Sequence, residues 1–308
     1  MKKNDLAIIC CLHSMTAMTP AFIAYHQAMG VRRFFLYLDR CPKVTVDRIA
    51  TLPGVECHIA DRDTNTDNII NQLACADHAL QRCRKLGIDW LLHIDVDEFA
   101  CGDDETGSLT NLLDKAPDDI EQIILRTRET IPTPVSSPWN FWEQHAVWSE
   151  TPPSRMILDP RTNQAVNVTR TLGHQQGKSL VRTSAPVQAG NSHRWTRYTG
   201  KQLPPLVDIP TLCLGEHIHF HLFSPEQWLE KYRAFDADKP FWPRGNSKPF
   251  PKQAWTELAS RIDLPEAIAY YRAWISINKE KADEYVRTGQ AHAVYVVSQT
   301  LKKCGFLP

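Results

Sequence analysis

Residues 91–99 read LLHIDVDEF, and this stretch decides how the chain is expected to fold. A short, mostly apolar run ends abruptly in the carboxylates of Asp95, Asp97 and Glu98. Such a run is typical of a strand that is buried on both faces of a parallel sheet. Burying negative charge is costly unless a cation compensates it. The stretch therefore indicates a buried strand whose carboxyl end lies beside positive charge.

The sequence before this stretch alternates between strand and helix patterns. A short apolar run predicts a strand at Leu6–Leu12, and further strands are predicted at Arg33–Leu38, Val55–Ile59 and Trp90–Ile94. Helical spacing predicts helices at Thr19–Met29, Val44–Leu52 and Asp67–Leu86. Strands separated by helices form βαβ units, so the expected fold class is α/β, with a mostly parallel sheet flanked by helices. Ligands of such sheets bind beyond the carboxyl ends of the strands, where these carboxylates stand.

The second half of the chain is less regular. Strand-like stretches predict strands at Ile120–Arg126, Lys178–Arg182 and Leu212–His221. A helix is expected to run from Ser224 to about Phe235, and the tail from Pro265 to Lys303 is expected to be mostly helical. Residues 131–160 are rich in Pro and Trp, and long irregular segments of this kind are usually functional or mobile.

Composition narrows the class of protein. Lys and Arg together number 35, as do Asp and Glu, so the net charge is zero and the basic excess of a nucleic-acid binder is absent. No apolar run approaches the roughly 18 residues of a membrane span, and the N-terminus lacks the pattern of a secretory signal. The nine cysteines form no C-x-x-C pair, which indicates a reducing cytoplasm and no disulfide framework.

The acidic and histidine residues are candidates for a metal site. Asp95 and Asp97 alternate along the expected strand end, so their side chains are expected to point the same way. Mn²⁺ and Mg²⁺ prefer oxygen ligands and would relieve the repulsion between two such carboxylates. The alternative is a polar strand end, a helix cap or a network of ion pairs. His217, His219 and His221 share one face of the last expected strand, and they either complete a metal site or pair with carboxylates.

Several stretches, in this order along the chain, resemble GT-A glycosyltransferases of family 2 and family 92. Trp90 and the DVDEF of residues 95–99 match their W-x-x-x-x-D-[IV]-D-E-F block, and YHQAMGV at 25–31 resembles their Y-H-x-x-x-G-V stretch. NQLACADHAL at 71–80, KSLVR at 178–182 and HFHLFS at 219–224 resemble further elements of these proteins. The chain departs from their pattern at His13-Ser14, where Asn-Glu is common, and at Phe223, where a basic residue is usual.

The resemblance implies an activity and a division of the chain. It implies transfer of a sugar from a nucleotide-sugar donor, expected to be a UDP-sugar, to a saccharide or glycoconjugate acceptor, with Mn²⁺ or Mg²⁺ as cofactor. It assigns residues 1–245 to a GT-A domain, with a nucleotide-sugar-binding half at 1–100 and an acceptor-side half at 101–245. Residues 246–308 become a helical extension. The implied setting is bacterial surface polysaccharide assembly in the cytoplasm, with peripheral association at the inner face of the membrane left open.

The resemblance also assigns roles to single residues. The expected metal ligands are Asp95, Asp97, His219 and His221, with Asp97 the main ligand and His219 favoured over His221. The donor is expected to contact Asp39, Asp95, Lys178, Arg182 and His193. Lys and Arg neutralise phosphates, and Asp39 follows the second strand, where similar proteins bind the base or ribose.

The acceptor side is expected in the Pro- and Trp-rich segment. Trp139 and Trp142 offer flat apolar faces of the kind that stack on sugar rings, although packing in a core would use the same faces. An inverting mechanism needs a carboxylate base, for which Glu129 and Glu143 are the candidates. A retaining mechanism needs no such base, and the sequence leaves the stereochemistry open.

Three other functions compete with this hypothesis. A sugar nucleotidyltransferase normally carries a Gly-rich, basic loop after its first strand, whereas CLHSMTAMTP at 11–20 has neither glycine nor a basic Lys or Arg. An inactive carbohydrate-binding or scaffold protein would tolerate loss of the metal ligands, yet Asp95, Asp97 and the late histidines are all present. A metallohydrolase would be expected to show an H-x-H-x-D cluster, whereas the H-x-H at His219 and His221 lacks the trailing Asp.

Overall fold

The computed structural model of the chain describes residues 4–12, 18–39, 41, 43–60, 68–137, 140–144, 146–149, 155–168, 176–237 and 252–306. Trp139, His13 and Ser14 lie outside the described residues. The chain forms two compact units: the first comprises the described residues within 1–127, 175–218 and 299–308, and the second those within 128–174 and 219–298. These units follow packing rather than chain order, and the expected functional division at residue 245 stays a prediction.

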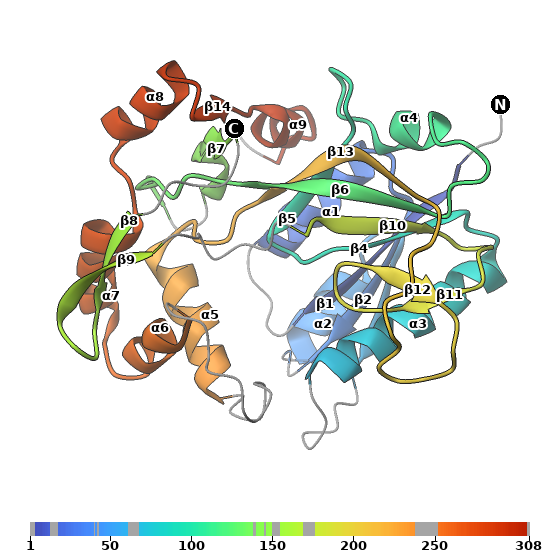
Figure 1. The fold of residues 1–308 in the computed structure, drawn as a ribbon, viewed down its shortest axis with the longest axis horizontal. Coiled ribbons are helices and arrows are strands. Elements are labelled where there is room, and N and C mark those ends of the chain that lie inside the picture. The colour runs from blue at the N-terminus through green and yellow to red at the C-terminus, as the bar shows by residue number, and fades with distance from the viewer. Residues whose placement is uncertain are drawn as a thin grey trace. The chain divides into compact units, whose positions relative to one another are not determined.

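The first unit is built on an eight-stranded sheet with the order β3-β2-β1-β4-β10-β6-β13-β5 (Figure 1). Parallel pairing joins four strands: β1 (Leu6–Leu12), β2 (Arg33–Leu38), β3 (Val55–Ile59) and β4 (Trp90–His93). The antiparallel strand β10 (Lys178–Arg182) joins β4 to β6 (Gln122–Glu129). The other two strands are β5 (Glu98–Cys101) and β13 (Thr211–His219). The expected α/β class is confirmed, and it is consistent with a Rossmann-like GT-A fold.

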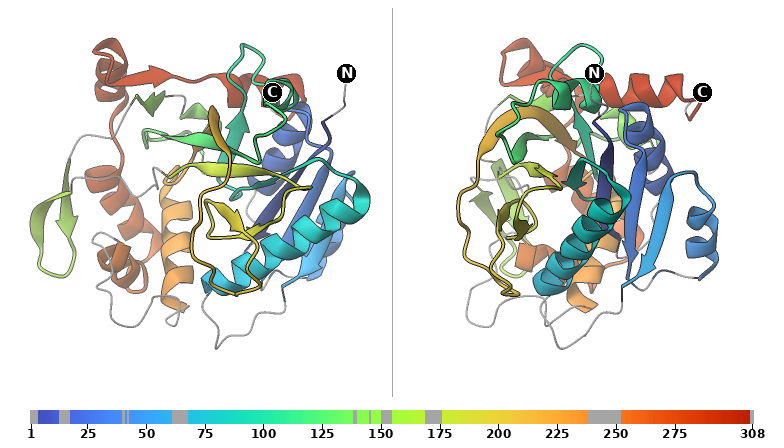
Figure 2. Two further views of the ribbon diagram at one scale, coloured as in Figure 1. Left: turned by 45° about the vertical axis from the view of Figure 1, so that its right-hand side comes forward. Right: turned by 90° about the vertical axis from the view of Figure 1, so that its right-hand side faces the viewer.

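Helices α1 (Met18–Ala28) and α3 (Asn68–Leu86) cover opposite faces of the parallel strands. Side chains alternate along β2, so Phe34 and Phe35 point to opposite faces. The Phe34 ring meets Phe22 of α1 edge-on, with 6.4 Å between the ring centroids, whereas Phe35 belongs to the buried cluster that α3 completes. Figure 2 shows the two helices on either side of the sheet.

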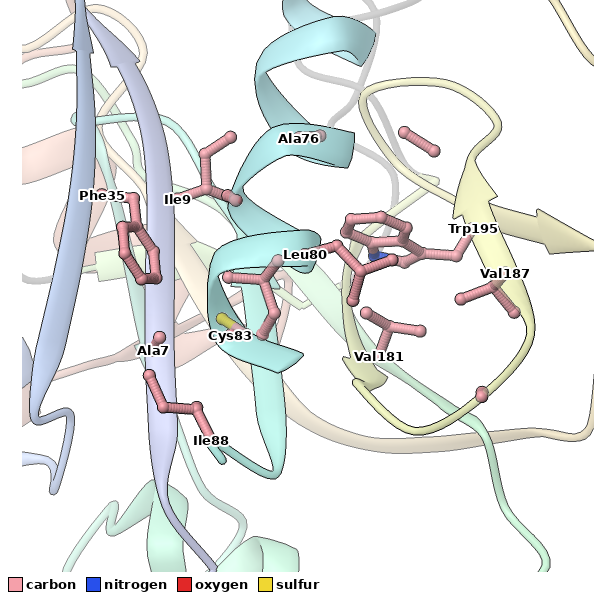
Figure 3. Packing of buried hydrophobic residues seen from close by; sticks show 14 of the residues in the cluster. Ala7, Ile9, Phe35, Ala76, Leu80, Cys83, Ile88, Val181, Val187 and Trp195 are labelled. Atoms are coloured by element: carbon pink, nitrogen blue, oxygen red, sulfur yellow. The ribbon is translucent and has the colours of Figure 1, made fainter. Parts of the chain in front are cut away.

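The inner face of α3 explains why this long helix stays on the sheet. Leu73, Ala76, Leu80 and Cys83 recur every three or four residues and are all buried. They pack against the sheet on one side and against the hairpin of β11 (Val187–Ala189) and β12 (Trp195–Arg197) on the other. Figure 3 shows α3 between β1 and this hairpin, with Ile9 on one side and Trp195 on the other. The helices α2 (Lys43–Ala50) and α4 (Leu109–Asp114) complete the unit.

The buried His26 ties α1 to strand β5. Its Nδ1–H donates to the Phe22 carbonyl at 2.8 Å, and its Nε2 accepts from the Ala100 N–H at 3.1 Å. A carbonyl can only accept and an amide N–H can only donate, so these partners fix the tautomer of a neutral ring. Burial lowers the pKa of His26 to about 3, although the Phe22 hydrogen bond opposes this. The YH of residues 25–26 is therefore a core contact that anchors β5 beside the carboxylates.

Because of His26, the free energy of unfolding is expected to decrease as the pH is lowered. Its folded pKa of about 3 lies below the ordinary value of 6.5, so the unfolded chain binds a proton more readily. The stabilisation is complete above pH 6.5 and is lost as the pH falls toward 3, by at most about 1.4 kcal/mol per pH unit. Urea titrations at several pH values on wild type and His26→Gln measure this. The variant should lose less stability per pH unit, and equal slopes would contradict the assignment.

The second unit combines two small sheets with helices. Its strand pairs are β7 (Ala146–Trp148) with β14 (Ala291–Ala293) and β8 (Arg155–Asp159) with β9 (Gln164–Val168). Its helices are α5 (Pro225–Ala237), α6 (Lys252–Ala259), α7 (Leu264–Tyr270), continued by a π-helical turn at Tyr271–Ile275, and α8 (Lys279–Arg287). An aromatic core joins α5, α6 and α7, in which Trp228 stacks on Tyr270 at 5.5 Å between centroids. The tail is mostly helical as expected, apart from β14.

The last helix, α9 (Val296–Lys303), begins among residues of the second unit and ends among those of the first. Among all the helices that the structure describes, not one combines the length and the apolar character needed to cross a membrane.

Candidate functional site

The carboxylates of DVDEF lie in a tight turn at the carboxyl end of β4. The Glu98 N–H donates to the Asp95 carbonyl at 3.1 Å, which closes a four-residue turn around Val96 and Asp97. The expected extended strand end is wrong here, because the backbone must reverse before β5 can rejoin the sheet. Asp97 is buried, whereas the Asp95 side chain is 46% exposed.

Lys178 supplies positive charge to this turn from the neighbouring strand β10. Its Nζ lies 2.6 Å from Asp95 Oδ2 and 3.3 Å from Glu98 Oε2, and its side chain is 1% exposed. Burial alone would lower the pKa of Lys178, but the charges of Asp95 and Glu98 and their hydrogen bonds outweigh it and raise that pKa above its usual value. The cation that compensates Asp95 and Glu98 in this structure is therefore a lysine of the chain itself.

Glu98 contacts the backbone of the turn and two neighbouring strands. Its Oε2 accepts a hydrogen bond from the Asp95 backbone N–H at 3.0 Å as well as contacting Lys178. Its Oε1 lies 3.4 Å from Nε2 of His217, which is 1% exposed on β13. Of the three late histidines, His217 is thus a partner of Glu98.

The register of β10 separates its two basic residues. Ser179 pairs with His93 and Arg182 with Trp90, so Arg182 lies at the opposite end of β4 from Asp95. Its guanidinium donates to the carbonyls of Ile120 and Pro117 and lies 4.4 Å from the centroid of the Trp90 ring. Arg182 therefore does not lie near Asp95 with Lys178, because the two residues stand at opposite ends of β10.

Asp39 and His193 lie at the same edge as Asp95. Asp39 follows β2, and its N–H donates to the carbonyl of Leu12 at the end of β1, at 2.8 Å. His193 belongs to the loop between β11 and β12, and its Nδ1–H donates to the carbonyl of Gly177, the residue before Lys178, at 2.8 Å. Four of the five expected donor-binding residues thus gather at the carboxyl edge of the parallel strands, with Arg182 the exception.

The other two histidines lie in the second unit with Glu129. Nδ1 of His219 is 2.8 Å from Glu129 Oε1, and the rings of His219 and His221 are 4.9 Å apart between centroids. A carboxylate accepts hydrogen bonds, so Glu129 places the proton on Nδ1 of a neutral His219 and leaves Nε2 as the basic nitrogen. Metal-binding histidines are commonly oriented in this way. Nδ1 of His221 instead accepts from Lys231 Nζ at 3.1 Å, so His219 is the better-prepared ligand of the two.

Glu143 and Trp142 make contacts with neighbouring residues of their own loop. Glu143 accepts from the Ser136 N–H at 2.9 Å, from Ser136 Oγ at 2.6 Å and from Asn140 Nδ2 at 2.8 Å. Burial raises the pKa of Glu143, but these hydrogen bonds outweigh it and lower that pKa below its ordinary value. A general base works best with a pKa near the working pH, so this geometry does not favour Glu143 as the base. The half-buried Trp142 meets Phe141 edge-on at 5.2 Å between centroids.

Part of the sequence is similar to that of a curated protein. No protein-family model matches the sequence. A glycosyltransferase-like protein of Arabidopsis thaliana is 24% identical over 233 residues, a match that covers 64% of this chain and 51% of that protein. The chain thus spans about half the length of this relative.

Solved structures give weaker likenesses. HddC from Yersinia pseudotuberculosis has a TM-score of 0.35 and 12% identity, with 78% of this chain and all of that chain covered. A 4-diphosphocytidyl-2C-methyl-D-erythritol synthase from Anaerococcus prevotii gives 0.30 and 9%, with 59% and 73% covered. A putative glucose-1-phosphate thymidylyltransferase from Bacillus anthracis gives 0.30 and 10%, with 58% and 71% covered. At such TM-scores these likenesses carry no argument about activity.

Proposed function

We propose that the protein is a glycosyltransferase that uses a divalent cation to transfer a sugar from a nucleotide-sugar donor to a saccharide or glycoconjugate acceptor. The observation that carries the proposal is the partly buried carboxylate turn of residues 95–98 at the carboxyl edge of parallel strands, the edge at which such sheets bind ligands. The name of the Arabidopsis relative, a glycosyltransferase-like protein, supports the same reading.

A Mn²⁺ or Mg²⁺ ion would be held by Asp97, His219 and His221. A buried carboxylate and imidazole nitrogens are suitable ligands for Mn²⁺, and Glu129 already orients His219 for such a role. When bound, the ion would stabilise the negative charge of the departing diphosphate. Because Lys178 holds Asp95, we assign Asp95 to the nucleotide or donor sugar rather than to direct metal contact.

The remaining residues would bind the two substrates. Asp39, Lys178 and His193 would face the donor at the carboxyl edge, with Lys178 also holding the turn. Trp142 and Trp139 would contact the acceptor. Glu129 is assigned to orienting His219, which leaves the base of an inverting mechanism unassigned and keeps a retaining mechanism open.

A thermal-shift screen with UDP, GDP, CMP and their sugar conjugates, with and without Mn²⁺, tests this function. A ligand that binds only the folded protein raises the melting temperature by mass action, by several degrees at about 100 times its Kd. We expect one nucleotide to act, only with Mn²⁺, and its sugar conjugate to act at least as strongly. No shift with any of them would contradict the proposal. UTP, GTP and CTP are screened in parallel, and a response confined to these triphosphates would favour a sugar nucleotidyltransferase.

A further inference from the structure

The turn of residues 95–98 is held from inside the fold by groups other than its proposed metal ligand. Glu98 lies at the first position of β5 with its side chain 5% exposed. It contacts three partners on different segments: the Asp95 N–H within the turn, Lys178 on β10 and His217 on β13. A carboxylate that bonds the amide of a nearby loop residue fixes the backbone of that loop, whatever else binds there.

A glycine lets β13 come close enough to supply His217. Gly215 has a φ of +75°, and a Cβ at this position would lie 2.9 Å from the Cys101 carbonyl of β5 and 2.3 Å from Leu112 Cδ1. Only glycine meets both demands without strain, since other residues rarely adopt this φ and would collide with the backbone of β5. His217 follows two residues later and reaches Glu98 across the same close approach.

We infer that Glu98 and His217 are positioning residues of the proposed metal site. His217 orients the Glu98 carboxylate, and Glu98 fixes the Asp95-Val96-Asp97 backbone and shares Lys178 with Asp95. Asp97 is thereby presented in one orientation. This inference rests on the proposed function for its metal, but the holding of the turn is a property of the first unit alone. The His217 side chain takes no part as a metal ligand, although it shares a strand face with His219.

Removing the Glu98 charge tests the inference. Glu98→Gln keeps the shape of the side chain but removes the negative charge that pairs with Lys178, and it replaces one of the two accepting oxygens by an amide donor. We expect the Kd for Mn²⁺, from calorimetry on the full chain, to rise about 10- to 100-fold, as for other residues that orient metal ligands. We also expect faster hydrogen exchange of the Asp95 amide, measured without metal. Glu121→Gln is the matched control. Glu121 forms an ion pair with Arg197, with 2.6 Å between Oε2 and Nη1, and this pair takes no part in the turn of residues 95–98. The control variant should change neither quantity.

His217→Gln tests the same inference by removing the β13 partner of Glu98, and it replaces Glu98→Gln as the test if that variant does not fold. It should shift both readouts in the same direction by a smaller factor. An unchanged Kd for Mn²⁺, or unchanged exchange at Asp95, in a folded variant would overturn the inference. If wild type binds no Mn²⁺, the metal part of the proposed function fails, and hydrogen exchange alone decides the inferred role. Loss of protection at the Asp95 amide in Glu98→Gln would support Glu98 as the residue that fixes the turn. Unchanged protection at this amide would refute it.

Discussion

Replacing Asp97 by Asn is expected to slow sugar transfer by about two to three orders of magnitude. Asn keeps the size of the side chain but removes the negative charge that attracts a divalent ion. Loss of that ion forfeits several kcal/mol of stabilisation of the departing diphosphate, and each 1.4 kcal/mol corresponds to about tenfold in rate. The measurement is release of nucleoside diphosphate from the donor that the thermal-shift screen identifies.

The same variant should keep its fold. Asp97 is buried in a turn, and Asn is well tolerated in turns, so the melting temperature without ligands should stay close to that of wild type. Asp119→Asn is the control, since Asp119 is an exposed acidic residue of the first unit. It should retain full turnover. Turnover by Asp97→Asn at the wild-type rate, with a donor that binds, would refute Asp97 as the main metal ligand.

Strands bounded by clear turn residues were predicted well from the sequence. The expected bounds of β1, β2, β3 and β10 agree with the structure. β1 and β2 are mostly apolar and each follows a charged residue, whereas β3 and β10 each begin directly after a glycine, Gly54 and Gly177. β5 was missed because it starts inside the acidic block, with Glu98 as its first residue. β14 and the hairpin of β11 and β12 were also missed, because three-residue strands are too short to show an alternating pattern.

The site was predictable in its residue types but not in its pairings. The acidic block after a buried strand correctly pointed to compensating positive charge, yet it gave no indication that Lys178 supplies it, 83 residues farther along the chain. That pairing depends on the antiparallel register of β10 against β4, which places Lys178 at the turn and Arg182 at the other end. His217 was grouped with His219 by strand alternation, and only the close approach at Gly215 brings it to Glu98. The clearest local signal available was the glycine two residues before His217.

Replacing Lys178 by Met is expected to lower the free energy of unfolding by about 3–5 kcal/mol. Met fills much of the same volume, so the loss comes mainly from charge rather than from a cavity. Glu98 would be left 5% exposed with its charge uncompensated, and Asp95 would lose a partner at 2.6 Å. Urea titration of the two proteins measures the difference. Lys115→Met is the matched control: Lys115 pairs with Asp103 at the same 2.6 Å but with its side chain 47% exposed, so its loss should matter much less.

A second substitution separates charge from packing. If the cost arises from an unpaired buried carboxylate, Lys178→Met with Glu98→Gln should be more stable than Lys178→Met alone, because the double variant removes both buried charges. If the cost arises from packing, the two losses should simply add. An additive result would mean that Lys178 acts as a core side chain, and the turn would then still need a cation from outside the chain to balance Asp95 and Glu98. Recovery in the double variant would show that the protein balances these two carboxylates with its own lysine.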